Sequence, residues 1–162
     1  MQLCRGTMNN TPEISQLTPS DHLNYFQNHP AIQSTNKIIW VNGCFDVIHA
    51  GHIDMLKYAR SLGQRLVVGL DTDYRVRESK GLNRPINNFN LRKKVLESIR
   101  YVDQVVEFGT DEQLLKEITK SGADTIVVGA EYEGKVKGSE LVGNVVLFPR
   151  LYDLSTTKII NR

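Results

Sequence analysis

The sequence contains little cysteine and no long apolar run. Its 162 residues include only two cysteines, Cys4 and Cys44, which form no CxxC pair, so neither a disulfide framework nor a cysteine-based zinc site is expected. No stretch approaches the ~20 consecutive apolar residues of a membrane-spanning helix. The amino-terminal residues also lack the basic start, apolar stretch and small-residue cleavage site of a secretory signal peptide. These absences predict a cytoplasmic protein with no membrane partner.

A strong excess of one charge is missing too, because the net charge at pH 7 is only +2. Basic residues nevertheless gather in one stretch that contains a single acidic residue, Glu78: Arg75, Arg77, Lys80, Arg84, Arg92, Lys93 and Lys94. Such a stretch is either a solvated helix face with a loop or a surface that attracts a small phosphorylated ligand. The near-neutral balance and the lack of an accompanying row of aromatic side chains disfavour nucleic acid as a partner.

Aliphatic residues are scarce in the first part of the chain. Residues 1–36 are rich in Asn, Gln, Thr, Ser and Pro, which predicts a polar amino-terminal extension, partly helical or disordered. Its one predicted helix is short and capped by Ser20. The histidines of this extension, His22 and His29, are interpreted as surface residues. Residues 37–162 form the predicted folded domain.

From Lys37 onward, short apolar runs alternate with helical patterns. The runs predict strands near residues 38–42, 65–71, 102–108, 124–129 and 144–149. Helical patterns predict helices within residues 51–63, 87–101 and 111–122, and the first turns of a last helix after residue 154. Continuous apolar strands that alternate with helices are typical of a parallel sheet covered on both faces. The sequence therefore predicts one three-layer α/β domain with a parallel five-stranded sheet.

Two histidines stand directly after the first predicted strand, in the segment "NGCFDVIHAGHIDML". In open parallel sheets, ligands bind beyond the carboxyl ends of the strands, where the amino termini of helices point. The unpaired N–H groups of a helix start favour an anion, and Gly51 would let a phosphate approach the backbone closely. His49 and His52 could donate hydrogen bonds to its oxygens. This segment therefore indicates a phosphate site.

Two other interpretations of the histidine pair are open. A pair spaced three apart could bind a transition metal, although structural zinc needs four ligands and no third histidine or further cysteine lies nearby. The histidines could also be incidental residues at a helix start. A GxGxxG fingerprint is absent after the first strand, which disfavours a dehydrogenase.

Two motifs carry a resemblance to a known family. The segment "NGCFDVIHAGHIDML" resembles the first motif of cytidylyltransferase-like nucleotidyltransferases, G-x-F-D-x-x-H-x-G-H. Near the other end of the domain, "LSTTKII" resembles their second motif, I-S-T-T-x-I. The resemblance covers about residues 37–162 and implies a Rossmann-like nucleotidyltransferase fold. It also implies a homodimer and a Mg²⁺ ion carried by the nucleotide, with no metal ligands from protein side chains.

The resemblance implies roles for particular residues. The expected catalytic residues are His49, His52 and Lys80. The expected nucleotide- and phosphate-binding residues are Asn42, Gly43, Cys44, Phe45, Asp46, Gly51, Arg92, Gly129, Arg150, Ser155, Thr156 and Thr157. The expected acceptor-binding residues are Asp71, Arg84, Glu131 and Tyr132.

Several of these residues have simpler alternatives. Ser155 and its neighbours could cap a helix without holding any ligand. Asp46 could be a structural hydrogen-bond acceptor. Lys80, placed by the sequence in a basic loop, could be a flexible surface residue, and Arg92 a solvated helix charge.

Two branches of the family share features with this chain. The stretches "VNGCFDVIHAGH", "SKGLNRPIN" and "GAEYEGKVKGSELV" are similar to heptose-1-phosphate adenylyltransferases. The stretches "IRYVDQVVEF", "YEGK" and "FPR…LSTTKI" are similar to glycerol-3-phosphate cytidylyltransferases. The first branch is favoured, because its matches lie in the loops expected to touch the acceptor.

The resemblance implies direct transfer of a nucleoside monophosphate to a sugar phosphate, with release of pyrophosphate. ATP and heptose 1-phosphate are the expected substrates, and ADP-heptose the expected product. CTP with glycerol 3-phosphate or another polyol phosphate is the alternative. Outside the enzyme class, the chain could be a nucleotide-binding regulatory module.

Overall fold

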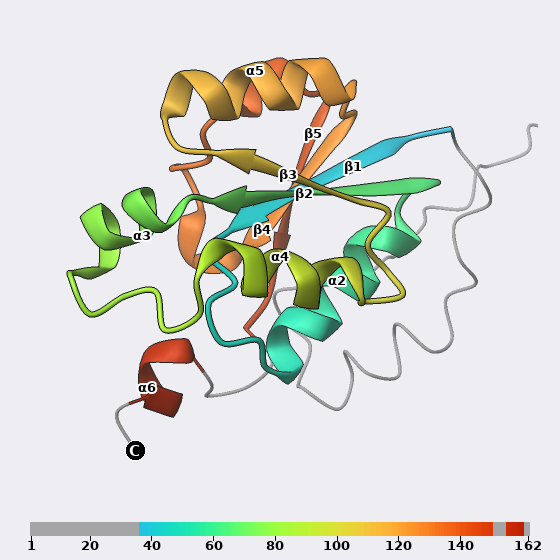
Figure 1. Ribbon diagram of the computed structural model, residues 1–162. Helices are drawn as coiled ribbons and strands as arrows, with labels where there is room; N and C mark the ends of the chain where they lie inside the picture. The colour runs from blue at the N-terminus through green and yellow to red at the C-terminus, as the bar shows by residue number, and fades with distance from the viewer. Residues whose placement is uncertain (1–35, 151–154, 161–162) are drawn as a thin grey trace, which may run out of the picture.

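A computed structural model describes residues 36–150 and 155–160 (Figure 1). The helix expected at Ser20 lies outside the described residues, as do both histidines of the extension. The proposed division of the chain after residue 36 therefore stays a prediction. Among the described helices, none has the length and apolar character needed to cross a bilayer.

The centre of the domain is a five-stranded sheet in which all neighbouring strands are parallel. Its strands are β1 (Ile38–Gly43), β2 (Arg65–Asp71), β3 (Gln104–Phe108), β4 (Thr125–Gly129) and β5 (Asn144–Phe148). They lie in the order β3-β2-β1-β4-β5, so β1 is the middle strand. The predicted α/β fold with a parallel five-stranded sheet is confirmed.

Helices follow most of the strands. They are α2 (Ala50–Ser61), α3 (Asp73–Lys80), α4 (Phe89–Glu97), α5 (Asp111–Ser121) and α6 (Thr156–Ile160), with two short 3₁₀ turns, η2 (Ala130–Tyr132) and η3 (Ser139–Leu141). The structure corrects one expectation, because the basic stretch that leads to Lys80 is a helix and not a loop. The hydroxyl of Thr72 accepts a hydrogen bond from the backbone N–H of Arg75 and so caps the start of α3. The helix ends at Gly81, whose φ of 98° is unfavourable for other residues.

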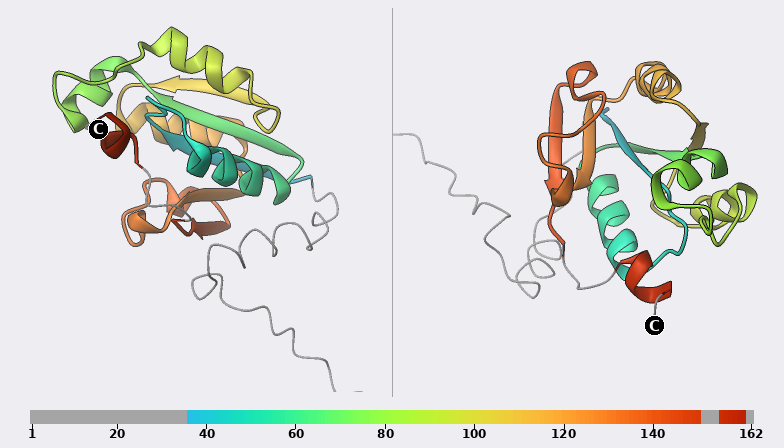
Figure 2. Two further views of the ribbon diagram at one scale, coloured as in Figure 1. Left: turned by 90° about the horizontal axis from the view of Figure 1, so that it is seen from below. Right: turned by 90° about the vertical axis from the view of Figure 1, so that its left-hand side faces the viewer.

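The helices cover both faces of the sheet (Figures 1 and 2). On one face, Leu56 of α2 and Leu96 of α4 pack with Ile39 and Val41 of β1. On the other face, helix α5 packs with Trp40 of β1 and its neighbours. Because consecutive residues of β1 point to opposite faces, both faces of the middle strand are buried. The strand ends are thereby held rigidly, and the loops beyond their carboxyl ends all begin at one edge of the sheet.

Candidate active site

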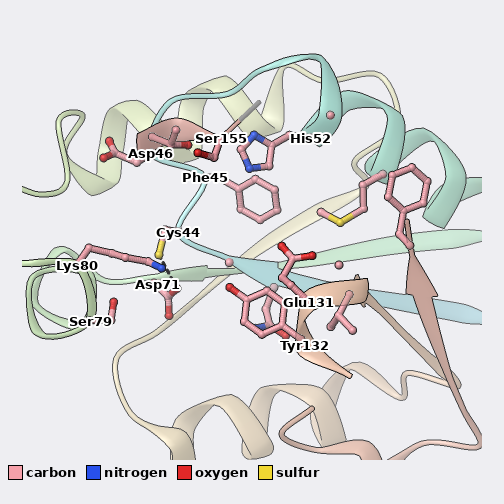
Figure 3. A pocket seen from close by; sticks show the side chains of 18 of the residues that line it. Cys44, Phe45, Asp46, His52, Asp71, Ser79, Lys80, Glu131, Tyr132 and Ser155 are labelled. Atoms are coloured by element: carbon pink, nitrogen blue, oxygen red, sulfur yellow. Dashed lines mark hydrogen bonds between the residues drawn. The ribbon is translucent and has the colours of Figure 1, made fainter. Parts of the chain in front are cut away.

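A cavity of about 760 Å³ opens at this edge, a size in the range of small-molecule sites. It is lined by residues at or just beyond the carboxyl ends of the five strands and by the start of α6. All but one of the predicted site residues line it: Asn42, Gly43, Cys44, Phe45, Asp46, His49, Gly51, His52, Asp71, Lys80, Arg84, Gly129, Glu131, Tyr132, Arg150, Ser155, Thr156 and Thr157. The exception is Arg92. Figure 3 shows that side chains from separate parts of the chain converge on this space.

The two histidines lie at the start of α2, where His49 is the N-cap residue. The backbone N–H of His49 donates a hydrogen bond to Nδ1 of His52, with 3.3 Å between the two nitrogens. Nδ1 of His52 is therefore an acceptor, and the proton of its neutral ring is on Nε2, where it can be donated to a ligand. The two rings are stacked, with 3.9 Å between their centroids and 31° between their planes.

Burial keeps both imidazoles uncharged near pH 7. It lowers the pKa of His52 to about 4, and the neighbouring His49 contributes to this effect. Burial and the charge of Arg150 also lower the pKa of His49. Nδ1 of His49 is buried, and no hydrogen-bond partner for it is found in the described part of the chain. An anion in the cavity would offer both rings a partner that favours their protonated forms.

The metal-site interpretation finds no support in residues 36–150 and 155–160. Within these ranges, no group of three or more His, Cys, Asp or Glu side chains could hold a metal ion. A transition-metal site built around the histidine pair would need such a group.

Phe45 adopts an unusual backbone conformation beneath the histidines. Its φ of 44° lies in the left-handed region, which residues other than glycine rarely adopt. Its side chain is buried, and its ring centroid lies 5.3 Å from that of His52. The strained turn therefore places an aromatic ring under His52, and strain of this kind is concentrated at functional sites.

Asp46 is a structural acceptor that fixes the loop before α4. Its carboxylate accepts hydrogen bonds from Nε of Arg84 at 2.5 Å and from the backbone N–H groups of Ile86 and Asn87, each at 2.9 Å. Burial opposes its ionisation, but these hydrogen bonds outweigh burial and lower its pKa. Arg84, which was expected to bind the acceptor, lines the cavity while it is paired with Asp46.

Arg92 does not line the cavity, and its expected role in phosphate binding stays a prediction. Its side chain is fully buried. The guanidinium donates to the carbonyl of Cys44 at 2.6 Å, to that of Asp71 at 2.9 Å and to that of Asn87 at 3.0 Å. It also pairs with the carboxylate of Asp73 at 2.7 Å. Arg92 is therefore not a solvated helix charge, because it joins the carboxyl ends of β1 and β2.

The second motif meets the first at the start of α6. The hydroxyl of Ser155 accepts a hydrogen bond from the backbone N–H of Lys158, so Ser155 caps the helix. The hydroxyl of Thr156 donates to the carbonyl of Val47 at 3.2 Å. This contact joins two segments that are 109 residues apart, and Figure 2 shows α6 beside the loop that precedes α2. Whether these residues also bind phosphate stays a prediction.

A model of the cytidylyltransferase-like family matches residues 40–162. The chain belongs to this family. The resemblance drawn from the two motifs is thereby confirmed, and so is the assignment to an enzyme family of nucleotidyltransferases.

Curated relatives of this family cover most of the chain. "Bifunctional protein HldE" of Campylobacter concisus is 47% identical over 127 residues, which are 78% of this chain and 27% of that protein. The protein of the same name from Sulfurimonas denitrificans is 38% identical over 157 residues, 92% of this chain and 32% of its own length. The chain thus spans about a quarter to a third of the length of these relatives.

Two solved structures are also similar. The lipopolysaccharide core biosynthesis protein of Thermoplasma volcanium is 27% identical, with a TM-score of 0.57 over 74% of this chain and 98% of that one. A protein from Archaeoglobus fulgidus is 17% identical, with a TM-score of 0.56 over 72% of this chain and 93% of that one, and it supports the fold alone.

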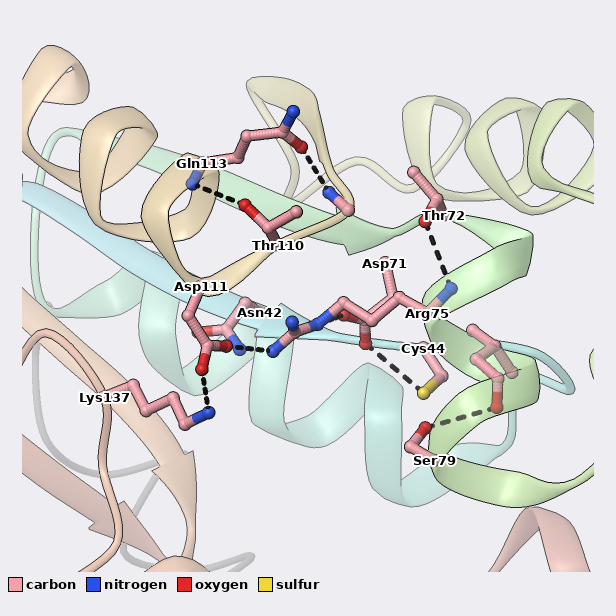
Figure 4. A network of polar contacts seen from close by, with 12 residues as sticks. Asn42, Cys44, Asp71, Thr72, Arg75, Ser79, Thr110, Asp111, Gln113 and Lys137 are labelled. Carbon is pink, nitrogen blue, oxygen red and sulfur yellow. Dashed lines mark hydrogen bonds and ion pairs between the residues drawn. The ribbon is translucent and has the colours of Figure 1, made fainter.

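The cytidylyltransferase-like site has charged residues that the sequence analysis did not select. Arg75, Asp111 and Lys137 line the cavity together with Asp71, and Figure 4 shows the contacts between them. Sequence signals exist for two of these residues, Arg75 and Asp111, but not for Lys137. Arg75 lies one helical turn after Asp71, and Asp111 begins the helix that follows β3, at the edge where ligands bind in parallel sheets.

Proposed function

We propose that the protein transfers the adenylyl group of ATP to heptose 1-phosphate, which gives ADP-heptose and pyrophosphate. The observation that carries the transfer reaction is the meeting of the stacked histidines of α2 with the start of α6 over one cavity. The resemblance of two loops to the heptose branch supports the acceptor. These loops, residues 79–87 and 129–142, contribute Lys80, Arg84, Glu131 and Tyr132 to the cavity wall.

The reaction is a direct displacement at phosphorus. An oxygen of the acceptor phosphate forms a bond to the α-phosphorus of ATP, and the bond between the α-phosphorus and the bridging oxygen to the β-phosphorus breaks. Pyrophosphate takes the electron pair of that bond as it leaves. No covalent intermediate with the protein is required, so the protein contributes positioning and charge stabilisation.

The histidines and Lys80 are the groups that stabilise the developing charge in this proposal. His52 donates from Nε2 to a phosphate oxygen, and His49 lies directly against it. Lys80 ends α3, and Figure 3 shows its ammonium group close to Cys44 and Asp71, at the carboxyl ends of β1 and β2. A cation at this place can neutralise the phosphates that react above β1. The hydroxyls of Ser155 and Thr157 and the backbone N–H groups at the start of α6 hold the outgoing pyrophosphate.

The adenine base is assigned to the apolar end of the cavity, beyond β4 and β5. Val128, Phe148 and Met55 line this end, and Tyr132 stands opposite the histidine loop (Figure 3). Apolar side chains with a few polar groups are the usual lining for a planar ring.

Mg²⁺ is proposed to accompany the triphosphate. An ion of this kind is held mostly by phosphate oxygens and water. When bound, the ion neutralises charge on the phosphates.

A coupled pyrophosphate assay tests the proposal, with ATP and CTP each combined with heptose 1-phosphate and glycerol 3-phosphate in the presence of Mg²⁺. We expect release with ATP and heptose 1-phosphate. Release only with CTP and glycerol 3-phosphate would move the protein to the cytidylyltransferase branch. A folded protein that binds a nucleotide but releases no pyrophosphate with either acceptor would have a different acceptor or would be a nucleotide-binding module.

A further inference from the structure

A row of interacting polar and charged side chains lines the cavity beyond β2 and β3 (Figure 4). The thiol of Cys44 donates to Oδ2 of Asp71 at 3.3 Å, and Oδ1 of Asp71 accepts from Nε of Arg75 at 2.8 Å. Nη2 of Arg75 donates to Oδ1 of Asp111 at 2.7 Å, and the other oxygen of Asp111 pairs with Lys137. We call Arg75, Asp111 and Lys137 the charged rim. The proposed transfer reaction assigns no work to these three residues.

The charge and exposure of the rim fit a neutral, hydroxyl-rich ligand. Two cations, Arg75 and Lys137, are balanced by Asp71 and Asp111, so the row adds no net charge that would hold a second phosphate. The exposed fraction of the side chain is 44% for Asp111 and 57% for Lys137. Their donors and acceptors are therefore open to exchange with ligand hydroxyls, which act both as donors and as acceptors.

The strand order separates the rim from the histidines by about two strand spacings. The histidine loop follows β1, Asp71 ends β2, and Asp111 follows β3. Neighbouring strands lie about 4.8 Å apart, so the end of β3 is roughly 10 Å from the end of β1. The apolar end of the cavity is on the opposite side of β1, beyond β4 and β5. An acceptor whose phosphate reacts above β1 therefore extends its far end over β2 towards the rim.

We propose that Asp111, with Arg75 and Lys137 on either side of it, binds the hydroxyls at the end of the sugar remote from its phosphate. The inference rests on the proposed function and deepens it, because it assigns the selection of a long sugar acceptor to the rim. A three-carbon acceptor such as glycerol 3-phosphate is too short to engage both the reaction centre and the rim. A site built to bind a hydroxyl strongly disfavours an analogue that lacks it, because its polar groups are then left unpaired.

A purely structural role for the rim is the competing explanation. Lys137 belongs to the segment between η2 and η3, and its pair with Asp111 joins this segment to the start of α5. Loss of a merely structural pair would affect all acceptors equally and would alter ATP binding as well. Loss of a specificity contact would affect the longer sugar more.

The test compares heptose 1-phosphate with mannose 1-phosphate, which has one carbon and one hydroxyl fewer at its far end. In Asp111→Ala we expect KM for heptose 1-phosphate to rise about tenfold, with kcat and KM for ATP within twofold of wild type. The preference for heptose over mannose 1-phosphate should fall by a similar factor. Lys137→Met should also raise KM for heptose 1-phosphate and lower the preference for heptose over mannose 1-phosphate. This second variant keeps the test valid if Asp111→Ala folds poorly.

The neighbouring Glu112 supplies the matched control. It is exposed, lies in the same first turn of α5 and does not line the cavity. Glu112→Ala should therefore leave KM for both acceptors unchanged. If both rim variants lost the same factor in kcat/KM with the two acceptors, or if KM for ATP rose in parallel, the inference would be overturned. The proposed function would then still stand. A wild-type protein that neither turns over heptose 1-phosphate nor binds it by calorimetry beside a non-hydrolysable ATP analogue would overturn the proposed function and the inference together.

Discussion

The two halves of the cavity are built in opposite ways. Beyond β1, the backbone is held in place by the fully buried guanidinium of Arg92, which donates hydrogen bonds to carbonyls of three separate segments. Beyond β2 and β3, the charged rim consists of ion pairs that are partly open to solvent, with exposed side-chain fractions of 25% for Arg75, 44% for Asp111 and 57% for Lys137. Buried hydrogen bonds permit one geometry, because breaking one leaves a polar group without water. Ion pairs that are open to solvent contribute little to the free energy of unfolding, and their partners exchange readily. The half of the cavity beyond β1 is therefore preorganised, whereas the half beyond β2 and β3 can adjust.

Replacement of His52 should have the largest effect on activity. In His52→Ala we expect kcat to fall about 10²- to 10³-fold, the usual loss for a preorganised donor to a developing oxyanion. The pyrophosphate assay measures the rate, and urea unfolding measures the fold. Because the imidazole is only partly enclosed, the free energy of unfolding should change far less than the rate. A variant with normal turnover would remove His52 from the mechanism.

Replacement of Arg92 should loosen the half of the cavity beyond β1. Arg92→Lys keeps the charge, but a single ammonium group cannot reach the carbonyls of Cys44, Asp71 and Asn87 together. We expect a loss of about 3 kcal/mol in the free energy of unfolding, the scale of a broken buried ionic network. Lys93→Met, one residue along on the exposed face of α4, is the control and should stay within about 0.5 kcal/mol of wild type. Similar stabilities for the two variants would contradict the role assigned to Arg92.

The partly buried His52 should also make the stability depend on pH. The pKa of His52 is about 4 in the folded protein and near 6.5 in the unfolded chain, so between these values the unfolded chain binds more protons. Stability should therefore fall as the pH is lowered from 6.5 towards 4, by at most about 3 kcal/mol, and should not depend on this group above 6.5.

Urea unfolding at pH 7, 6, 5 and 4.5 measures this slope. These values lie above the range in which Asp46 and Asp111 protonate, since both carboxyl groups have lowered pKa values. In His52→Gln, which cannot titrate, the slope should be clearly smaller. An equal slope in both proteins would assign the effect to other groups.

The charged rim should contribute least to stability. Asp111→Ala removes two exposed pairs, and we expect the free energy of unfolding to change by less than about 1 kcal/mol. Thermal or urea unfolding at 0.05 and 0.5 M salt measures this change, which should shrink further at the higher salt concentration. A loss as large as that of Arg92→Lys would mean that the two halves of the cavity are equally rigid.

The sequence predicted the sheet because its strands are continuous apolar runs that are buried on both faces. It also predicted the histidine loop and the start of the last helix, since both follow strong local patterns. It missed helix α3, in which Val76 is the buried residue and the apolar periodicity is therefore weak. It did not show that Arg92 is buried, because residue type and position do not show how deeply a side chain lies. The charged rim was missed for a related reason, since Arg75, Asp111 and Lys137 meet only in the tertiary structure.

The contact between Thr156 and Val47 makes the site dependent on the order in which the chain is made. A ribosome completes the histidine loop about a hundred residues before it reaches α6, so for much of its synthesis a nascent chain carries only one of the two segments that meet at the cavity. Sequence separation of this size delays contact formation, because the loop must close before the contact can stabilise it. Because β5 and α6 are neighbours in the sequence, the last strand of the sheet and the segment that contacts Val47 are synthesised almost together. The complete sheet and the complete cavity should therefore appear at nearly the same stage of translation.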